Sequence, residues 1–155
     1  MKIILFQPQI PQNAGNIVRT CSVTNTGLVM VRPFGFSTSR RQLKRAGLDY
    51  WNDVLIEEID DLPAYLQDAN RPFYFFSSKT TRKYTDFSYE NDALLIFGNE
   101  TAGLPPVFRE KYPDRFATLP MKKDARCLNL ANSAAIALYE ALRQQNFSFA
   151  QAAQT

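Results

Sequence analysis

LLIFGNETAGLPP (residues 94–106) is an apolar run that ends abruptly at a Gly-Asn-Glu turn. A second stretch, LPMKKDARCLNLANSAAIALYEALRQ (residues 119–144), is a polar turn that leads into a helix rich in small residues. In α/β proteins, a glycine turn after a strand lets a ligand lie close to the backbone. The pair therefore predicts a ligand site at the carboxyl ends of strands.

Strands and helices alternate along the rest of the chain. Apolar and β-prone runs predict strands at residues 2–6, 28–31, 54–59, 73–76, 93–97 and 116–119. Residues 10–19 are predicted to be a loop that turns into a helix, and further helices are predicted at residues 37–46, 60–68, 107–111 and 129–145. We expect Asn13 or Asn16 to cap the first helix and Arg19 to lie near the end of its first turn. This alternation is typical of an α/β fold with a mostly parallel sheet and helices on both faces.

Composition indicates a globular protein with one domain. The 155 residues are enough to bury a sizeable core, so we expect residues 1–155 to form a single domain. No apolar run approaches the ~20 residues of a membrane span, and no membrane partner is expected. The N-terminal stretch MKIILFQPQIPQN meets proline too early for a secretory signal. The two cysteines form no CxxC pair, which disfavours zinc and disulfides, and cytoplasm is the expected location.

The absence of histidine excludes several kinds of chemistry. A Ser-His-Asp triad, a Cys-His pair and an imidazole metal site are all impossible, and no metal is expected. The net charge of +3 is only weak support for a nucleic-acid partner. Basic residues cluster in two places, which is typical of a phosphate-binding surface but equally of a solvated helix face. The clusters are Arg40, Arg41, Lys44 and Arg45, and then Lys122, Lys123 and Arg126.

Two segments could bind a ligand through backbone groups. NAGNIVR (residues 13–19) precedes a helix, and helix N-termini favour anions, although the asparagines could be caps and Arg19 a surface charge. In FGNETAGLP (residues 97–105), Gly98 and Gly103 allow positive φ and close approach of a flat ligand. Glu100 could hold a cation or cap the next helix. Neither segment is a P-loop or a GxGxxG fingerprint, so nucleotide hydrolysis and dinucleotide binding are poorly supported.

The third segment, CLNLANSAA (residues 127–135), enters the final helix. Its small side chains allow another backbone to pack closely, either within the chain or across a dimer. Tyr139, one turn later, could be a packed aromatic or a site residue.

Together and in this order, the patterns NxGNxxR, FGxExxGLP and LPMxxxxRxLNLxNxxA resemble the three motifs of the SPOUT (trefoil-knot) RNA 2′-O-ribose methyltransferases. The connecting stretches QPQIPQNAGNIVRTC, RPFGF and KRAGLDYW are similar to small bacterial members that act on the wobble position of tRNA. The resemblance covers residues 2–146 and leaves no room for a separate RNA-binding domain.

The resemblance implies a C-terminal deep trefoil knot, whereas general topology rules would predict an unknotted sheet. It implies S-adenosylmethionine as the methyl donor, S-adenosylhomocysteine as the product, and no metal. The positions that match cofactor contacts, largely made by backbone groups, are Phe76, Gly98, Leu119 and Cys127. Cys127 stands where serine is common in the family.

The implied activity is 2′-O-methylation of cytidine or uridine 34 in a tRNA anticodon stem-loop, carried out by a homodimer and not on DNA. The matching catalytic-site positions are Arg19, Glu100 and Asn129. Because the pKa of arginine lies above 12, an electrostatic role for Arg19 is favoured over a general base. Asn129 is expected to hold a loop, and Glu100 to orient the site or an arginine. The expected substrate-binding residues are Asn13, Arg40, Arg41, Lys44 and Tyr139, with Lys122, Lys123 and Arg126 as further phosphate contacts.

Three alternatives remain open from the sequence. The first is a 2′-O-methyltransferase of the same class that acts on another tRNA or rRNA position. The second is a non-catalytic RNA- or ligand-binding knot protein. An unrelated flavodoxin-like domain is disfavoured, because Pro8 and Pro11 intervene where its phosphate loop should follow the first strand.

Overall fold

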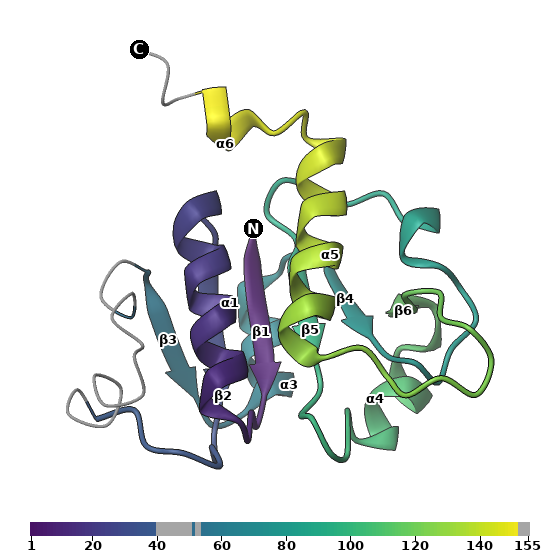
Figure 1. The fold of residues 1–155 in the computed structure, drawn as a ribbon, viewed down its shortest axis with the longest axis horizontal. Helices are drawn as coiled ribbons and strands as arrows, with labels where there is room; N and C mark the ends of the chain where they lie inside the picture. Colours follow the sequence, from purple (N-terminus) through teal and green to yellow (C-terminus); the bar gives the residue numbers. More distant parts are fainter. Residues whose placement is uncertain (40–50, 52–53, 152–155) are drawn as a thin grey trace.

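The computed structural model describes residues 1–39, 51 and 54–151 (Figure 1). The strands are β1 (Lys2–Phe6), β2 (Gly27–Val31), β3 (Ile56–Ile59), β4 (Phe73–Phe76), β5 (Leu94–Phe97) and β6 (Phe116–Ala117). The helices are α1 (Pro11–Thr24), α3 (Leu62–Ala69), α4 (Pro106–Lys111), α5 (Leu130–Gln144) and α6 (Ser148–Gln151), with short 3-10 turns η2 (Tyr84–Asp86) and η3 (Pro113–Arg115). No helix in these ranges is both long and apolar enough to cross a membrane.

The strands form one sheet in the order β3-β2-β1-β5-β4-β6. All five strand pairings are parallel, and Leu5 of the central strand β1 lies between Met30 of β2 and Phe97 of β5. Parallel strands need crossover connections, which place helices over the faces of the sheet. The prediction of a mostly parallel sheet with helices on both faces is therefore confirmed.

Each face of the sheet has its own core. Successive strand residues point to opposite faces, so Ile3 and Leu5 pack toward α1 and α5, while Ile4 packs toward α3 and α4. Figure 1 shows α1 and α5 side by side over the near face. On the far face, the ring of Phe75 stacks on Phe116 at 4.8 Å between ring centroids. The central strands are buried on both sides, which explains their continuous apolar sequences.

The first helix begins differently from the prediction. Residue Ile10 is its N-cap and makes no side-chain capping bond, while Pro11 occupies the first helical position. Asn13 and Asn16 therefore lie inside the helix and cap nothing, and Arg19 lies well beyond the first turn. The expectation of a local asparagine cap was wrong, because the capping group comes from Glu100, far away in the sequence.

The last helix follows the prediction closely. The side chain of Asn129 accepts hydrogen bonds from the backbone amides of Ala131 and Asn132 and so caps α5. The predicted helix at residues 37–46 lies mostly outside the described residues, and residues 37–39 are not helical.

Candidate active site

Three segments from distant parts of the sequence meet at the carboxyl end of the sheet. They are the loop after β1, the turn after β5 and the start of α5. In parallel α/β sheets the carboxyl ends of strands are the usual place for a ligand site. The contacts between the three segments are made by side chains that the sequence singled out.

Glu100 connects the turn after β5 to the start of α1. Its carboxylate accepts hydrogen bonds from the backbone amides of Gln9 at 2.8 Å and Ile10 at 3.1 Å. The side-chain amide of Asn13 donates a third, at 3.1 Å. A carboxylate at the N-terminus of a helix is stabilised by free amides and by the helix dipole. Glu100 therefore caps α1, and not the helix that follows it in the sequence.

Asn13 links Glu100 to the third segment. It is 5% exposed, and its side-chain oxygen accepts a 2.8 Å hydrogen bond from the side-chain amide of Asn129. Asn129 in turn caps α5. The three side chains form a continuous hydrogen-bonded chain, which we call the Glu100–Asn13–Asn129 network. It holds all three sequence motifs in one arrangement.

The turn after β5 is ordered by its own backbone. A Cβ atom on Gly98 would lie 2.2 Å from the carbonyl carbon of Gly103 and 2.4 Å from the nitrogen of Leu104. The side chain of Asn99 accepts hydrogen bonds from the amides of Thr101 and Ala102. Only Gly103 has a positive φ, of 70°. The freedom to adopt a positive φ is therefore used at Gly103, whereas at Gly98 the lack of a side chain allows close approach of the chain itself.

Of the four positions matched to cofactor contacts, Gly98 lies in this turn and the other three follow or end the neighbouring strands β4 and β6 or precede α5. Phe76 is 8% exposed and its ring stacks on Phe97, and Leu119 is 9% exposed. Cys127 is exposed, with its sulfur 3.5 Å from the hydroxyl oxygen of Ser78. The aromatic ring of Phe76 belongs to the core, so at that position mainly the backbone faces a ligand.

The loop between β6 and α5 offers unpaired backbone groups. Within residues 119–128 of the described chain, the one backbone–backbone hydrogen bond runs from Ala125 to the carbonyl of Lys122. The same loop exposes the apolar side chains of Met121 and Leu128. Free amides and carbonyls beside exposed apolar side chains suit a flat, mostly apolar ligand with a polar edge.

The loop after β4 is held on two sides by the C-terminal third of the chain. On one side, Thr118 exchanges backbone hydrogen bonds with Arg82 and Tyr84. On the other side, the side chain of Gln144 bonds to the backbone of Phe87 and Tyr89. The residues that follow β4 thus contact both the end of β6 and the end of α5.

Arg19, predicted as a catalytic residue, is exposed on α1. The predicted substrate-binding residues fall in three places, and Asn13 belongs to the Glu100–Asn13–Asn129 network. Tyr139 is 44% exposed on α5, with its ring 6.4 Å from that of Phe147. The basic side chains predicted to contact RNA, Arg40, Arg41 and Lys44, lie outside the described residues.

Burial removes one potential nucleophile. It raises the pKa of the Cys21 thiol on α1 to about 12, so this thiol stays protonated near neutral pH. Among the residues that the structure describes, no group of three or more His, Cys, Asp or Glu side chains could hold a metal ion.

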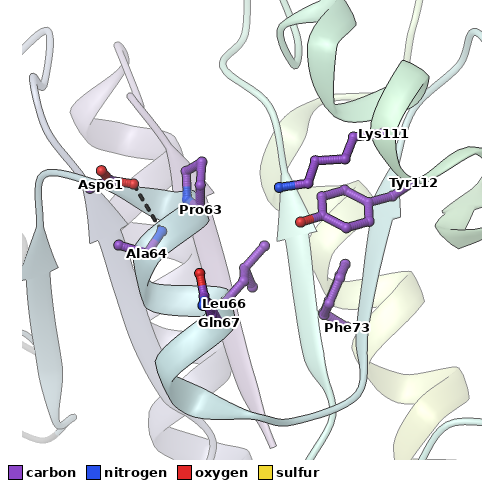
Figure 2. Close-up of a pocket in the computed structure, with 8 residues that line it drawn as sticks. All are labelled: Asp61, Pro63, Ala64, Leu66, Gln67, Phe73, Lys111 and Tyr112. Carbon is purple, nitrogen blue, oxygen red and sulfur yellow. Dashed lines mark hydrogen bonds between the residues drawn. The ribbon is translucent and has the colours of Figure 1, made fainter.

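Two cavities flank α4. One, of about 430 Å³, lies between α3 and α4 on the far face; Figure 2 shows Lys111 and Tyr112 facing Leu66 and Gln67 across it. The other, of about 390 Å³, adjoins the turn after β5. Its lining comprises Ser77, Lys79, Leu104, Pro105, Pro106, Arg109, Glu110 and Phe116. Of these, only Leu104 and Pro105 belong to a segment that the sequence singled out for ligand binding, and the rest were not predicted.

Comparison with known proteins gives consistent matches over nearly the whole chain. The SpoU rRNA Methylase family matches residues 1–139. A protein of Geobacillus stearothermophilus is 46% identical over 151 residues, covering 95% of this chain and 96% of its own. A protein of Methylovorus glucosotrophus, named tRNA (cytidine(34)-2′-O)-methyltransferase, is 41% identical over 148 residues. The match covers 94% of this chain and 96% of that protein.

Solved structures share the fold. One, from work on the 2-OH methylation of C/U34 on tRNA, has a TM-score of 0.80 and 38% identity, and the match covers 94% of this chain and 95% of that one. The SpoU methyltransferase AviRb from Streptomyces viridochromogenes, in complex with AdoMet, has a TM-score of 0.79 and 26% identity. That match covers 94% of this chain and 58% of AviRb.

Proposed function

Since this chain belongs to the SpoU rRNA methylase family, we propose that it transfers a methyl group from S-adenosylmethionine to a tRNA. The acceptor is the ribose 2′-oxygen of cytidine or uridine 34 in the anticodon loop. One observation carries the proposal: the Glu100–Asn13–Asn129 network brings the three motifs together at the carboxyl end of the sheet. Relatives of matching length that carry this activity by name support the same conclusion.

The described residues fit the cofactor. Backbone groups at Phe76, Gly98, Leu119 and Cys127 would hold it, since the loop that contains the last two makes only one backbone–backbone hydrogen bond among the described residues. When bound, S-adenosylmethionine supplies a methyl group on a positively charged sulfur. Exposed Met121 and Leu128 would cover its apolar parts and exclude water. If the contact at Cys127 is made by the backbone, the change from serine costs little affinity.

Arg19 is the proposed catalytic residue. A guanidinium donates hydrogen bonds and has no acceptor atom, so Arg19 would stabilise negative charge on the ribose oxygen and on the adjacent phosphate, while the hydroxyl proton leaves to solvent water. The planar N–H donors of the Arg19 guanidinium would also orient the ribose. Orienting the acceptor before reaction lowers the activation barrier of a transfer between two substrates, because the entropy cost is met on binding. Glu100 and Asn129 act as positioning residues, because their polar atoms are engaged in capping α1 and α5.

The working form is proposed to be a homodimer joined through α1 and α5. The two helices lie side by side on one face (Figure 1), and that face exposes Val23, Ile136 and Tyr139 at 62%, 40% and 44%. The small residues of α5 do not serve this interface as the sequence suggested. Ala131, Ala134, Ala137 and Ala141 are buried inside their own chain, where α5 packs on α1 and β5.

A trefoil knot at the C-terminus is supported by the path of the chain. The loop after β4 contacts Thr118 and Gln144, and Cys127 in the segment between them contacts Ser78 at the start of the same loop. Such threading would bring the loops of the cofactor site together and hold them. We also propose that the chain forms one domain and works in the cytoplasm. Lys122, Lys123 and Arg126 are proposed to contact phosphates of the tRNA.

The test is to incubate the protein with total tRNA and labelled S-adenosylmethionine, and to map the modified nucleotide. Methylation of the ribose of nucleotide 34 is expected. Methylation at another tRNA or rRNA position would instead favour a different enzyme of the same class. Calorimetry should show cofactor binding without added metal, and no binding at millimolar cofactor would overturn the enzymatic proposal.

A test of the dimer uses Ile136→Asp, which should give an inactive monomer in sedimentation and activity measurements. Val107→Asp is the matched control, because Val107 is also apolar and 57% exposed but lies on α4. A fully active Ile136→Asp monomer would contradict the proposed arrangement.

A further inference from the structure

The 390 Å³ cavity beside the turn after β5 has no assigned role. Its lining includes Ser77, the first residue after β4, and Leu104, where the chain leaves the turn after β5, so it adjoins the proposed methyl-transfer site. None of the four positions matched to cofactor contacts lines it. Its volume is within the range of about 300–1,000 Å³ that is usual for ligand pockets.

The lining divides into an apolar wall and a charged rim. Leu104, Phe116 and residues 105–106 form the wall, and Lys79 and Arg109 lie on the rim with the single carboxylate of Glu110. Lys79 and Arg109 are exposed, and neither takes part in any ion pair among the described residues. Two unpaired cations against one carboxylate leave the rim with a net positive charge.

Resting on the proposed function, we propose that this cavity binds a nucleotide of the tRNA next to the methylated one. The base lies on the apolar wall, and Lys79 and Arg109 bind a backbone phosphate. Unstacked bases of RNA loops are bound in this way, on apolar or aromatic surfaces beside cations. A positive rim attracts phosphate and repels the positively charged sulfur of the methyl donor, which disfavours the cofactor as the occupant.

The test compares three lysine or arginine variants of the full-length protein. Lys79→Ala and Arg109→Ala remove the rim charges. Lys111→Ala is the matched control, because Lys111 lies two residues after Arg109 on α4 but lines the other cavity (Figure 2). The probe is a synthetic anticodon stem-loop RNA, and its dissociation constant is measured at several salt concentrations.

Each rim variant should weaken RNA binding on the order of 10-fold, as expected for loss of a charged hydrogen bond. Each should also reduce the slope of log affinity against log salt by about 1, whereas Lys111→Ala leaves both unchanged. Cofactor affinity by calorimetry should match wild type in all three variants. Circular dichroism and unfolding curves confirm that they fold.

Equal loss of RNA binding in all three variants would overturn the cavity proposal in favour of general surface charge. Loss of cofactor affinity in the rim variants would also overturn it, by assigning the cavity to the methyl donor. If wild-type protein binds the RNA with the expected variant pattern but does not methylate it, the proposed function fails and the cavity stands. If it does not bind the RNA at all, both fail.

Discussion

The side-chain amide of Asn129 donates a 2.8 Å hydrogen bond to the side-chain oxygen of Asn13, which lies 116 positions earlier in the chain. Asn129 caps α5 with its oxygen, and Asn13 donates to Glu100, which caps α1. Two helix N-termini are thereby fixed relative to each other by one pair of amides. The arrangement of the proposed site depends on this pair more than on any single loop.

Asn13→Ala should lower the free energy of unfolding by ~1–3 kcal/mol, because it leaves part-buried groups of Asn129 and Glu100 without their partner. Asn16→Ala is the control on the same helix. Its side chain is exposed, and the expected change is within ~0.5 kcal/mol. Urea unfolding of both variants gives the comparison, and equal losses would contradict the role assigned to Asn13.

Gly98→Ala should be more damaging than Gly103→Ala. At Gly98 a Cβ atom would overlap the backbone of Gly103 and Leu104, and relieving the clash should cost at least ~3 kcal/mol of unfolding free energy. At Gly103 there is open space, and the penalty is that of a positive φ, ~1–2 kcal/mol. Denaturant unfolding checks the order, and a larger loss at Gly103 would show that the turn rearranges.

Local structure could be predicted from the sequence, but contacts between distant segments could not. Within the described residues, the strands and the helices α3, α4 and α5 were predicted within a few residues, since they follow from local apolar patterns. The cap of α1 could not be predicted from the sequence, because the carboxylate of Glu100 reaches the start of α1 only when β5 lies beside β1 in the sheet. Likewise, no local pattern separates Arg109 from Lys111. Which cavity each one lines depends on how α4 packs on the sheet.

Arg19→Ala should reduce the rate of methyl transfer on the order of 100- to 1,000-fold, the usual effect of removing a group that stabilises developing negative charge. Cofactor affinity should remain close to wild type. Arg19→Lys keeps the charge but loses the planar fork, so it should recover only part of the rate. Single-turnover kinetics and calorimetry separate the two effects. If cofactor affinity and rate fell together, Arg19 would have a structural role in the site and not a catalytic one.

The two cysteines should differ sharply in reactivity. A thiol reagent at pH 8 should modify exposed Cys127 in the native protein, and buried Cys21 only after unfolding, because burial raises the pKa of the Cys21 thiol to about 12. Saturating S-adenosylmethionine should slow modification of Cys127 if its position borders the cofactor. The Cys127→Ser variant identifies the reactive residue, and unchanged labelling in the presence of cofactor would place Cys127 outside that site.

The pair formed by Lys2 and Glu57 predicts a dependence of stability on pH. The Lys2 side chain on β1 passes beside Gly27 of β2, and its ammonium lies 2.8 Å from the carboxylate of Glu57 on β3. The hydroxyl of Tyr65 donates a hydrogen bond to the same carboxylate. The hydrogen bond from Lys2 lowers the pKa of Glu57 below its ordinary value of 4.5. Burial works against the charge of Lys2, but its bonds to Glu57 and Tyr65 outweigh burial and raise the pKa of Lys2 above 10.5.

A lowered carboxylate pKa contributes stability that is present above pH 4.5 and is lost as pH falls through the folded value. A raised ammonium pKa contributes stability that is present below pH 10.5 and is lost as pH rises through the folded value. Glu57→Gln should therefore cost ~0.2–1 kcal/mol at pH 7, the range for a solvent-accessible pair. The difference from wild type should shrink at pH 3 and in high salt. Urea unfolding at both pH values measures it, and a difference that persists at pH 3 would assign the effect to packing and not to charge.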